Sequence, residues 1–366
     1  MKKNLLKIAS IVLAGSMILA SCKKDDDPKP APENKEEQKT TPGEETTTGA
    51  YSNATFVVCQ GNFQQNEGSI DAIINGVVTK DIFQKENGRP LGDIAQSMIK
   101  TGDKAFIVMN NSGKVEAVNV HTFKSEGICK GLSYPRYVAN RNDEEIFVSN
   151  GNGLSDDDYV YVINKQTMQK TDSVPTGFGP NTMVVSNGKL FVANSGGWST
   201  DKTITVIDTK TLAVEKTITV GDNPYDMDID ENGNIIVFCQ GASTYDENWN
   251  TIPLTNAAIY TINGSTLEAS ATIEFDHQLQ STGYNLIAYN NGIIYYIDNG
   301  INTFSKGETN KIIEGSFFSI SIDPTTNDIW VGETPQNSSH SEKQYDKAGN
   351  LIKTYSVTNM PEAVIF

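Results

Sequence analysis

The sequence predicts an all-β fold, a seven-bladed β-propeller built from four-stranded antiparallel blades. Three observations lead to this prediction. A short apolar segment recurs seven times, the clearest copy lies in a unit of four strand-like runs, and the chain ends on a strand with no polar tail after it. A period of about 40 to 45 residues with four strands per repeat is typical of a propeller blade.

The N-terminus predicts a lipoprotein signal peptide over residues 1–21. Three lysines flank an apolar run from Ile8 to Ala20, which is too short to span a bilayer as a helix. The run closes on Leu19-Ala20-Ser21-Cys22, which resembles a bacterial lipobox, where the signal is cleaved before a cysteine that takes a diacylglycerol. Lipidation is therefore expected at Cys22. The alternative is an ordinary secretory signal with an incidental cysteine.

Residues 22–50 are predicted to form a disordered acidic tether, because Pro, Glu, Lys and Thr dominate them and little can be buried. The stretch CKKDDD resembles the acidic export signal that sends Bacteroidetes lipoproteins to the outer face of the outer membrane, although a solvated charge run has the same composition. Loss of the three signal lysines takes the formal net charge from -16 to -19. Such a chain should repel nucleic acid and anionic lipid, so membrane attachment is expected to come from the lipid anchor.

The strand pattern is clearest between residues 180 and 224. Four β-rich runs follow one another there: NTMVV, KLFVAN, TITVIDT and VEKTITV. Asn187-Gly188 separates the first two runs, and this dipeptide favours a two-residue hairpin turn because both positions need positive φ. The unit is therefore predicted to be one four-stranded antiparallel blade.

The second run of this unit occurs seven times, at intervals of 35 to 58 residues: TFVVCQ (55–60), FIVMN (106–110), IFVSN (146–150), LFVAN (190–194), IIVFCQ (235–240), IIYYID (293–298) and IWVGE (329–333). The first run also recurs, and it often begins at a proline, as at Pro135, Pro180, Pro224 and Pro361. The copy at 55–60 has no first run before it, because only the tether precedes it. The C-terminal NMPEAVIF (359–366) is therefore predicted to pair with the first blade and to close a ring of residues 51–366, which removes open sheet edges.

The alternation of strands places two sets of connections on one face, here called the upper face. If first strands run away from this face, it carries the connections that follow second strands and those that lead into first strands. These connections include the long loops, whereas the turns on the lower face are mostly tight Asn-Gly types. Long loops on one face of a rigid scaffold commonly carry binding.

Amide and aromatic side chains, rather than charges, fill the upper connections. Aromatic rings supply large contact area at low entropic cost, and Asn or Gln pairs with both donors and acceptors, so this face suits a large neutral ligand decorated with amides or hydroxyls. The candidate ligand-binding residues are Asn62, Phe63, Asn111, Tyr134, Arg136, Asn152, Phe178, Asn181, Asn194, Trp198, Tyr225, Gln240, Tyr245, Trp249 and Tyr284. Alternatively, Asn and Gly act there as turn formers, and the aromatic rings pack between blades.

The motifs indicate no metal site and no catalytic constellation. Besides Cys22, the candidate ligands are Cys59, Cys129, Cys239, His121, His277 and His340, which lie far apart in the sequence. Residues 228–234, DIDENGN, begin like a calcium loop, but the twelfth position is a cysteine rather than Glu, which favours a hairpin turn at Asn232-Gly233. Asp156–Asp158 could hold a cation or form a solvated acidic tip. His277 precedes a first strand on the upper face, where it could act as a base or a metal ligand. We expect no enzyme activity, no metal and no cofactor.

The FVAN and VIDTKT segments resemble the YVTN-type propeller repeat, over nearly all of the chain after the tether. Together with the lipobox, the acidic tether and the closing strand, these repeats are similar to Bacteroidetes surface propellers of the BtuG type. That resemblance implies a protein that captures cobalamin or a related corrinoid and passes it to a TonB-dependent outer-membrane transporter. No ligand contact is carried over from that family to a residue of this chain.

The sequence therefore predicts a lipid-anchored protein of the outer membrane, facing the cell exterior, that binds a corrinoid on the upper face. Two other functions use the same fold. A glycan- or protein-binding scaffold of the adhesin kind would use the same loops. A propeller lyase or lactonase would need converging His, Asp or Glu side chains, and the small number of histidines counts against it.

Overall fold

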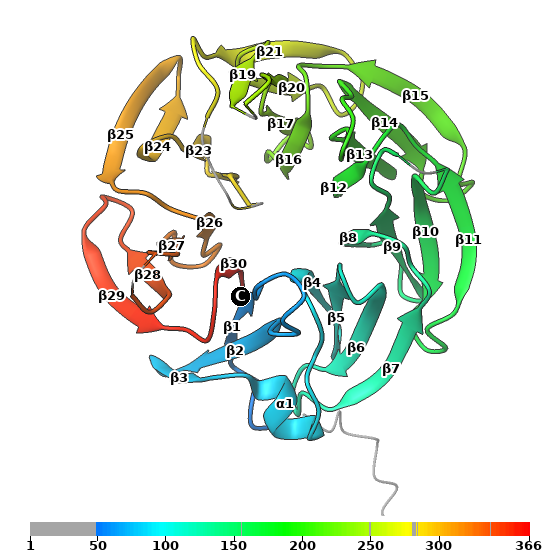
Figure 1. The fold of residues 1–366 in the computed structure, drawn as a ribbon, viewed down its shortest axis with the longest axis vertical. Coiled ribbons are helices and arrows are strands. Elements are labelled where there is room, and N and C mark those ends of the chain that lie inside the picture. Colours follow the sequence, from blue (N-terminus) through cyan, green and yellow to red (C-terminus); the bar gives the residue numbers. More distant parts are fainter. Residues whose placement is uncertain (1–48, 155, 249, 280–282, 284, 337) are drawn as a thin grey trace, which may run out of the picture. The chain divides into compact units, whose positions relative to one another are not determined.

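The computed structural model describes residues 49–154, 156–248, 250–279, 283, 285–336 and 338–366. Within these residues, seven four-stranded antiparallel sheets stand around a common centre, as the blades of a propeller (Figure 1). The predicted signal peptide, Cys22 and nearly all of the predicted tether lie outside the described residues. The helix found in the described part is too short and too polar to cross a membrane.

The strands follow the same order in every blade, from the centre outward. The first strands are β30 (Pro361–Ile365), β4 (Ala95–Thr101), β8 (Pro135–Asn140), β12 (Pro180–Ser186), β16 (Pro224–Ile229), β22 (Ile287–Asn290) and β26 (Ser319–Ile322). The second strands are β1 (Thr55–Cys59), β5 (Lys104–Met109), β9 (Glu145–Asn150), β13 (Lys189–Asn194), β17 (Ile235–Cys239), β23 (Ile293–Ile297) and β27 (Ile329–Glu333). The third strands are β2 (Ser69–Ile74), β6 (Lys114–Asn119), β10 (Tyr159–Asn164), β14 (Thr203–Asp208), β20 (Ala258–Ile262), β24 (Gly300–Ser305) and β28 (Ser341–Tyr345). The fourth strands are β3 (Val77–Thr79), β7 (Ser125–Lys130), β11 (Lys170–Pro175), β15 (Val214–Thr219), β21 (Ala269–Glu274), β25 (Glu308–Glu314) and β29 (Leu351–Ser356). We number the blades 1 to 7 in this order, so blade 1 contains β30, β1, β2 and β3.

All seven apolar segments found in the sequence are second strands, and the four predicted prolines each begin a first strand. The predicted Asn187-Gly188 turn is also present, with φ of 51° and 73° at its two residues. The strand order, the number of blades and the turn chemistry were therefore predicted correctly.

The ring is closed by the C-terminal strand, as predicted. β30 pairs antiparallel with β1, with Val57 opposite Val364 and Val58 opposite Ala363. Figure 1 shows the two strands side by side, although they come from opposite ends of the ring in the sequence. The pairing gives blade 1 the inner strand that its own sequence lacks, and it leaves β1 with hydrogen-bonded partners on both edges.

The core lies between neighbouring sheets. One phenylalanine from the second strand of each of five blades is almost fully buried: Phe56, Phe106, Phe147, Phe191 and Phe238. Each apolar cluster joins residues of adjacent blades, and the cluster of Val57, Trp330, Tyr355 and Val364 joins blades 7 and 1 at the closure. Stacked sheets bury apolar area on both faces of each blade, which makes each blade depend on its neighbours.

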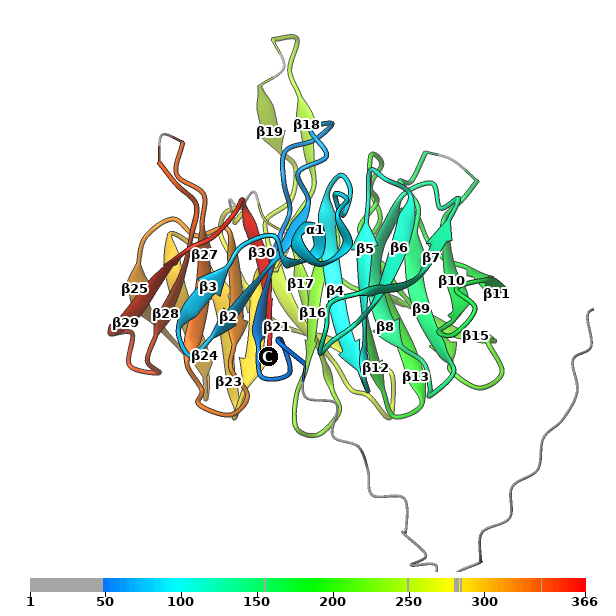
Figure 2. The same ribbon diagram turned by 90° about the horizontal axis from the view of Figure 1, so that it is seen from below.

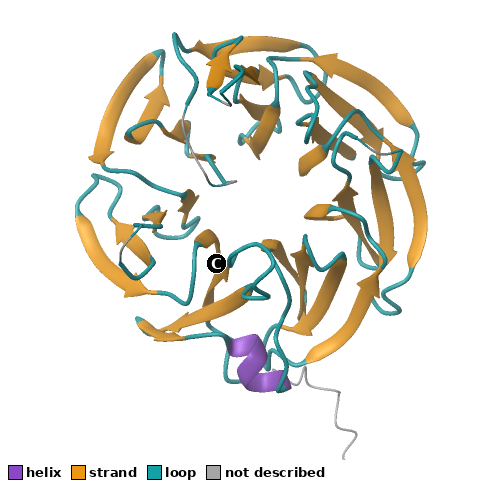
Figure 3. Ribbon diagram, viewed as in Figure 1, coloured by secondary structure: helices purple, strands orange, loops and turns teal. Residues whose placement is uncertain are grey.

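Two elements were not predicted from the sequence. Helix α1 (Ile82–Asn87) lies at the outer rim between blades 1 and 2 (Figure 3). The Asp81 side chain accepts a hydrogen bond from the Gln84 backbone N–H at its start, and Gly88 ends it in the left-handed conformation. The second element is a hairpin of β18 (Ser243–Tyr245) and β19 (Thr251–Pro253), inserted between the second and third strands of blade 5.

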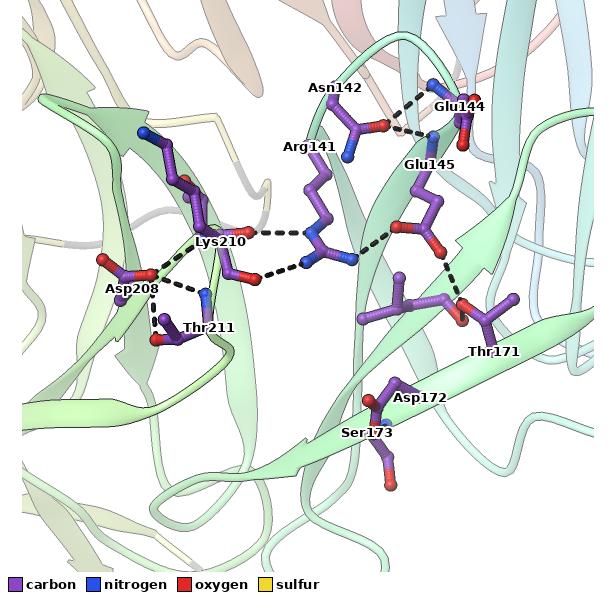
Figure 4. Close-up of polar contacts among 12 residues, drawn as sticks. Arg141, Asn142, Glu144, Glu145, Thr171, Asp172, Ser173, Asp208, Lys210 and Thr211 are labelled. Atoms are coloured by element: carbon purple, nitrogen blue, oxygen red, sulfur yellow. Dashed lines mark hydrogen bonds and ion pairs between the residues drawn. The ribbon is translucent and has the colours of Figure 1, made fainter.

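An arginine joins blades 3 and 4 on the lower face (Figure 4). Arg141 Nε donates to the Thr209 carbonyl at 2.8 Å and Nη2 donates to the Lys210 carbonyl at 3.1 Å, while Nη1 pairs with Glu145 of its own blade. The two carbonyls belong to the turn between β14 and β15, which the Asp208 side chain holds by accepting from two backbone N–H groups. This lower turn is therefore engaged in joining two blades.

Candidate functional site

The upper face carries the longest connections of the ring. Figure 2 shows the β18–β19 hairpin projecting from it, and all six residues of these two strands are exposed. The hairpin presents apolar side chains at Tyr245, Ile252 and Leu254, which are 62%, 44% and 62% exposed. Exposed apolar residues at the end of a projecting element are typical of contact surfaces rather than of solvated loops.

Five of the predicted aromatic residues lie exposed on the upper connections: Phe63, Tyr134, Phe178, Trp198 and Tyr245. Trp198 is the most exposed of them at 74%. Two further predicted aromatic residues, Trp249 and Tyr284, lie outside the described residues. The alternative, in which these rings pack between the blades, does not describe the five exposed side chains.

The connections of blades 3 and 4 interlock. The Trp198 backbone N–H donates to the Asn152 carbonyl at 2.7 Å, and the Gly196 N–H donates to the Phe178 carbonyl at 2.8 Å. A Cβ atom on Gly197 would stand 2.2 Å from the Asn152 carbonyl oxygen, so only glycine permits this approach. The interlocked loops carry Leu154, Phe178 and Trp198, all more than half exposed, and we call these three side chains the apolar patch. Leu154 had no signal in the sequence beyond its place in a long loop.

Several predicted amide residues are not surface contacts but structural. Asn194 is fully buried, and its Nδ2 donates to the hydroxyls of Thr203 and Thr205 at 2.9 Å. Asn181 is fully buried, and its Nδ2 donates to the Tyr225 carbonyl at 2.8 Å. Asn152 is also buried, and its Oδ1 accepts from the Leu154 backbone N–H.

The remaining predicted residues lie on the upper face with different degrees of exposure. Asn62 donates to Glu67 at 2.8 Å and Asn111 donates to Asp93 at 2.6 Å, both as exposed loop residues. Arg136 is half-buried, with its Nε donating to the Gly151 carbonyl at 3.2 Å. Tyr225 and Gln240 are half-buried.

Polar side chains gather at the inner strands, where the blades meet. Gln96, Arg136, Asn181, Tyr225 and Glu362 each follow the first residue of an inner strand, in five different blades. In all five strands the pairing with the second strand shifts at this place by a bulge, which re-aims the side chains. The sequence analysis named Arg136, Asn181 and Tyr225 but missed Gln96 and Glu362.

Some of these buried polar atoms have no hydrogen-bond partner within the described part of the chain. They include Gln96 Nε2 and Asn181 Oδ1, from blades 2 and 4. A buried polar atom without a partner costs about 1 to 3 kcal/mol. These atoms lie below the surface of the described structure, so they are not themselves exposed contacts.

Two buried carboxylates bind the inner strands of blades 5 and 6 together. Asp226 Oδ2 accepts from the backbone N–H groups of Leu286 and Ile287, at 2.7 and 3.0 Å, and Asp228 Oδ2 accepts from Tyr289 at 2.7 Å. Burial raises the pKa of Asp226 to about 7 and that of Asp228 to about 6. These carboxylates replace the backbone pairing that an inner strand edge lacks, so we assign them a structural role.

The candidate ionisable residues of the upper face are explained by local contacts. His277 Nδ1 lies 2.7 Å from Asp276 Oδ1 and its Nε2 lies 3.3 Å from the Asp298 carboxylate. Hydrogen bonding to Asp276 is the main cause that raises the pKa of His277. Among the residues that the structure describes, no three His, Cys, Asp or Glu side chains are grouped as metal ligands.

The two acidic loops weighed as cation sites are also held by protein contacts. Asp157 accepts from Asn150 Nδ2 at 3.0 Å and from Tyr161 Oη at 2.5 Å, so Asp157 is not part of a solvated tip. Asp230 accepts from the backbone N–H groups of Asn232 and Asn234, and Gly233 has a φ of 78°. Residues 230–234 therefore form a hairpin turn, as the sequence favoured.

Comparison with known proteins identifies the family and the fold. A family model described as "Domain of unknown function (DUF5074)" matches residues 53–366. No sequence among the curated proteins matches this chain.

Three solved structures illustrate the likeness of fold. A quinonprotein alcohol dehydrogenase-like protein from Bacteroides thetaiotaomicron is 14% identical, with a TM-score of 0.67, over 86% of this chain and 78% of the other. A putative 6-phosphogluconolactonase from Bacteroides fragilis is 14% identical, with a TM-score of 0.58, over 85% of this chain and 97% of the other. The periplasmic gluconolactonase of Pseudomonas aeruginosa is 13% identical, with a TM-score of 0.59, over 85% of this chain and 98% of the other. At these identities the likeness shows the propeller fold alone.

Proposed function

Because the chain belongs to the DUF5074 family along its whole propeller, a family whose description states no activity, we propose its function from the upper face. The protein binds a ligand there and does not transform it. The observation that carries this proposal is the set of exposed aromatic side chains on the upper connections, Phe63, Tyr134, Phe178, Trp198 and Tyr245.

We propose a corrinoid such as cobalamin as the ligand. A corrin ring is broad and flat and is fringed with amides, so it needs both apolar area and hydrogen-bonding groups from several loops at once. The apolar patch supplies exposed area at Leu154, Phe178 and Trp198. The half-buried Arg136, beside the same loops through its bond to the Gly151 carbonyl, supplies hydrogen-bond donors. This arrangement supports a ligand that spans blades 3 and 4.

The place of the protein in the cell follows from its N-terminus. The resemblance of Leu19–Cys22 to a lipobox supports a lipid anchor at Cys22, and the acidic tether supports exposure on the outer membrane. A surface protein that captures a corrinoid needs a route for it across that membrane. We propose that a TonB-dependent outer-membrane transporter receives the ligand from the upper face. The resemblance to BtuG-type propellers supports this step.

The proposal is tested by titrating the full chain, purified in detergent, with cyanocobalamin and following heat release and the corrin absorbance. We expect saturable binding, and Trp198→Ala should weaken it about thirtyfold, because truncating a central aromatic contact costs about 2 kcal/mol. The matched control is Leu351→Ala, which removes an exposed apolar side chain from the outer strand β29. Equal affinity of both variants would place the ligand elsewhere.

The alternatives give different outcomes in the same assay. Binding of neutral oligosaccharides without binding of any corrinoid would identify a glycan-binding scaffold. Hydrolysis of gluconolactone would identify a lactonase, an activity named for two of the structural neighbours. Absence of corrinoid binding at micromolar protein would overturn the corrinoid proposal and leave the propeller unaffected.

A further inference from the structure

A hollow of different chemistry lies at the rim of blades 1 and 2. It has a volume of about 460 Å³ and opens between the segment that follows α1 and the upper ends of β6 and β7. Its lining includes three cations, two small polar side chains and three glycines: Arg89, Lys114, Lys130, Asn66, Ser112, Gly92, Gly113 and Gly131. The chain as a whole carries a formal charge of -16, so this concentration of cations runs against the composition of the protein.

One buried carboxylate accounts for part of this positive charge. Glu116 is fully buried, and its Oε1 lies 2.5 Å from Arg89 Nη2 while its Oε2 lies 2.8 Å from Lys114 Nζ. Ser125 Oγ also donates to Glu116 Oε1. A single carboxylate balances one of the two cations. Lys130 adds a third cation and the buried Asp93, beside Gly92 of the lining, adds a second carboxylate, so the cations exceed these two carboxylates by one.

Arg89 and Lys114 retain N–H donors that Glu116 and Ser125 do not use. An ammonium carries three N–H donors and a guanidinium carries five, and Glu116 and Ser125 use only some of them. The Lys130 side chain is exposed and makes no hydrogen bond or ion pair to another residue of the described part of the chain. A further cation, Lys170, reaches the same rim, where its Nζ donates to the Gly131 carbonyl at 3.3 Å.

The backbone leaves room for a ligand among these groups. Gly131 has a φ of 75°, and a Cβ atom placed on it would meet no atom within 4 Å, so that side of the hollow is open. Gly113 has a φ of 57°, and a Cβ atom there would stand 2.4 Å from the Leu132 carbonyl oxygen. A side chain at position 113 would clash with this carbonyl oxygen, so this part of the lining requires glycine.

We infer that this hollow binds a compact oxyanion, namely a phosphate or sulfate group, either free or as the monoester of a larger molecule. Lys130 offers an exposed ammonium group for the oxygens of such a group, and Arg89 and Lys114 add positive charge although both also bind Glu116. The rest of the chain is strongly negative and repels anions, so an anion should bind at the hollow rather than elsewhere on the surface. The site lies in blades 1 and 2, apart from the apolar patch of blades 3 and 4.

The test is a calorimetric titration of the full chain at low ionic strength with inorganic phosphate, inorganic sulfate and N-acetylglucosamine 6-sulfate. We expect saturable binding of at least one of them. Lys130→Glu should weaken that binding about tenfold or more, because reversing a charge at a few ångströms from the anion converts an attraction into a repulsion. Lys130 serves best because Arg89 and Lys114 also hold the buried Glu116. The matched control is Lys347→Glu, which makes the same charge change at an exposed lower turn.

Each outcome decides the inference. Tighter binding of the sugar ester identifies an esterified group as the ligand, and tighter binding of an inorganic ion identifies the free anion. No binding of any of the three probes overturns the inference. An equal loss in Lys347→Glu overturns it as well, because binding then depends on total charge rather than on the hollow. Unchanged binding in Lys130→Glu also overturns it. Corrinoid binding should be unaffected by Lys130→Glu, so this inference and the proposed function fail independently.

Discussion

The buried carboxylate of Asp226 should make the stability of the ring depend on pH between about 4 and 7. Asp226 is 4% exposed, and it accepts backbone hydrogen bonds from Met227, Leu286 and Ile287. Burial nevertheless raises its pKa from 3.8 to about 7. Since the folded pKa lies above the unfolded one, the folded state holds the proton more tightly. The stability that this group contributes is therefore complete below pH 4 and is lost as the pH rises through 7.

The size of the effect follows from the shift. Each pKa unit corresponds to about 1.4 kcal/mol, so a rise of about three units amounts to roughly 4 kcal/mol between the two ends of the window. Other carboxylates of the chain also titrate in this pH range, so the informative quantity is the difference in the free energy of unfolding between the unmodified protein and a variant. Asp226→Asn keeps the shape and one acceptor of the side chain but cannot ionise. Relative to the unmodified protein, this variant should gain stability as the pH rises from 4 to 7.

The assay is urea unfolding at several pH values from 4 to 8, followed by fluorescence, for the unmodified protein and Asp226→Asn. The control is Asp143→Asn, which makes the same substitution at an exposed lower turn and against which the pH dependence of Asp226→Asn is compared. If the difference in the free energy of unfolding between Asp226→Asn and the unmodified protein does not change with pH, the raised pKa of Asp226 is refuted. A variant that instead loses relative stability with rising pH would show that the three N–H donors outweigh burial and hold the carboxyl ionised.

Two further predictions concern closure and anchoring. Val364→Ala should lower the free energy of unfolding by about 2 kcal/mol, because Val364 is 6% exposed in the cluster that joins blades 7 and 1. The control Val77→Ala removes an exposed side chain from β3 of blade 1 and should change this free energy little. Equal effects of the two variants in urea unfolding would contradict the view that the closure stabilises the ring. Cys22→Ser should release the protein from the membrane fraction in a folded form, measured by fractionation and far-ultraviolet circular dichroism, and continued tight membrane retention would contradict the lipid anchor.

Much of the fold was predictable because each blade repeats the same physical solution. The second strands are buried on both faces and therefore read as short apolar runs, and Pro135 or Pro224 marks the start of an inner strand. Helix α1 was not predictable in the same way. It is six residues long, and it depends on Asp81 in a left-handed conformation and on burial of Ile82 and Phe83, which only the packing of blade 1 supplies.

The candidate site was predictable in position but not in the role of each residue. Loop composition identified Trp198 and Phe178, which are exposed. It could not separate them from Asn194, which has the same kind of sequence context but is turned inward to bond two threonines. Whether an upper amide faces solvent or the blade depends on its neighbours in the folded ring, such as Thr203 and Thr205 for Asn194, which are on another strand.

The cationic hollow had no signal in the sequence, because Arg89, Lys114 and Lys130 are far apart in the chain. They are brought together by the fixed order of strands within blade 2 and by the link that follows α1. Clusters formed by different strands become visible only once the register of the sheets is known. The sequence showed only that the chain is acidic overall.

The proposal that the upper face of this propeller binds a corrinoid is tested most directly by hydrogen exchange of the full chain with and without saturating cyanocobalamin. We predict slower exchange of the upper connections of blades 3 and 4, at residues 151–154, 176–179 and 195–202, with no change in the lower turns at 187–188 and 209–211. Protection confined to the lower turns, or exchange that is identical with and without cyanocobalamin, would contradict the account.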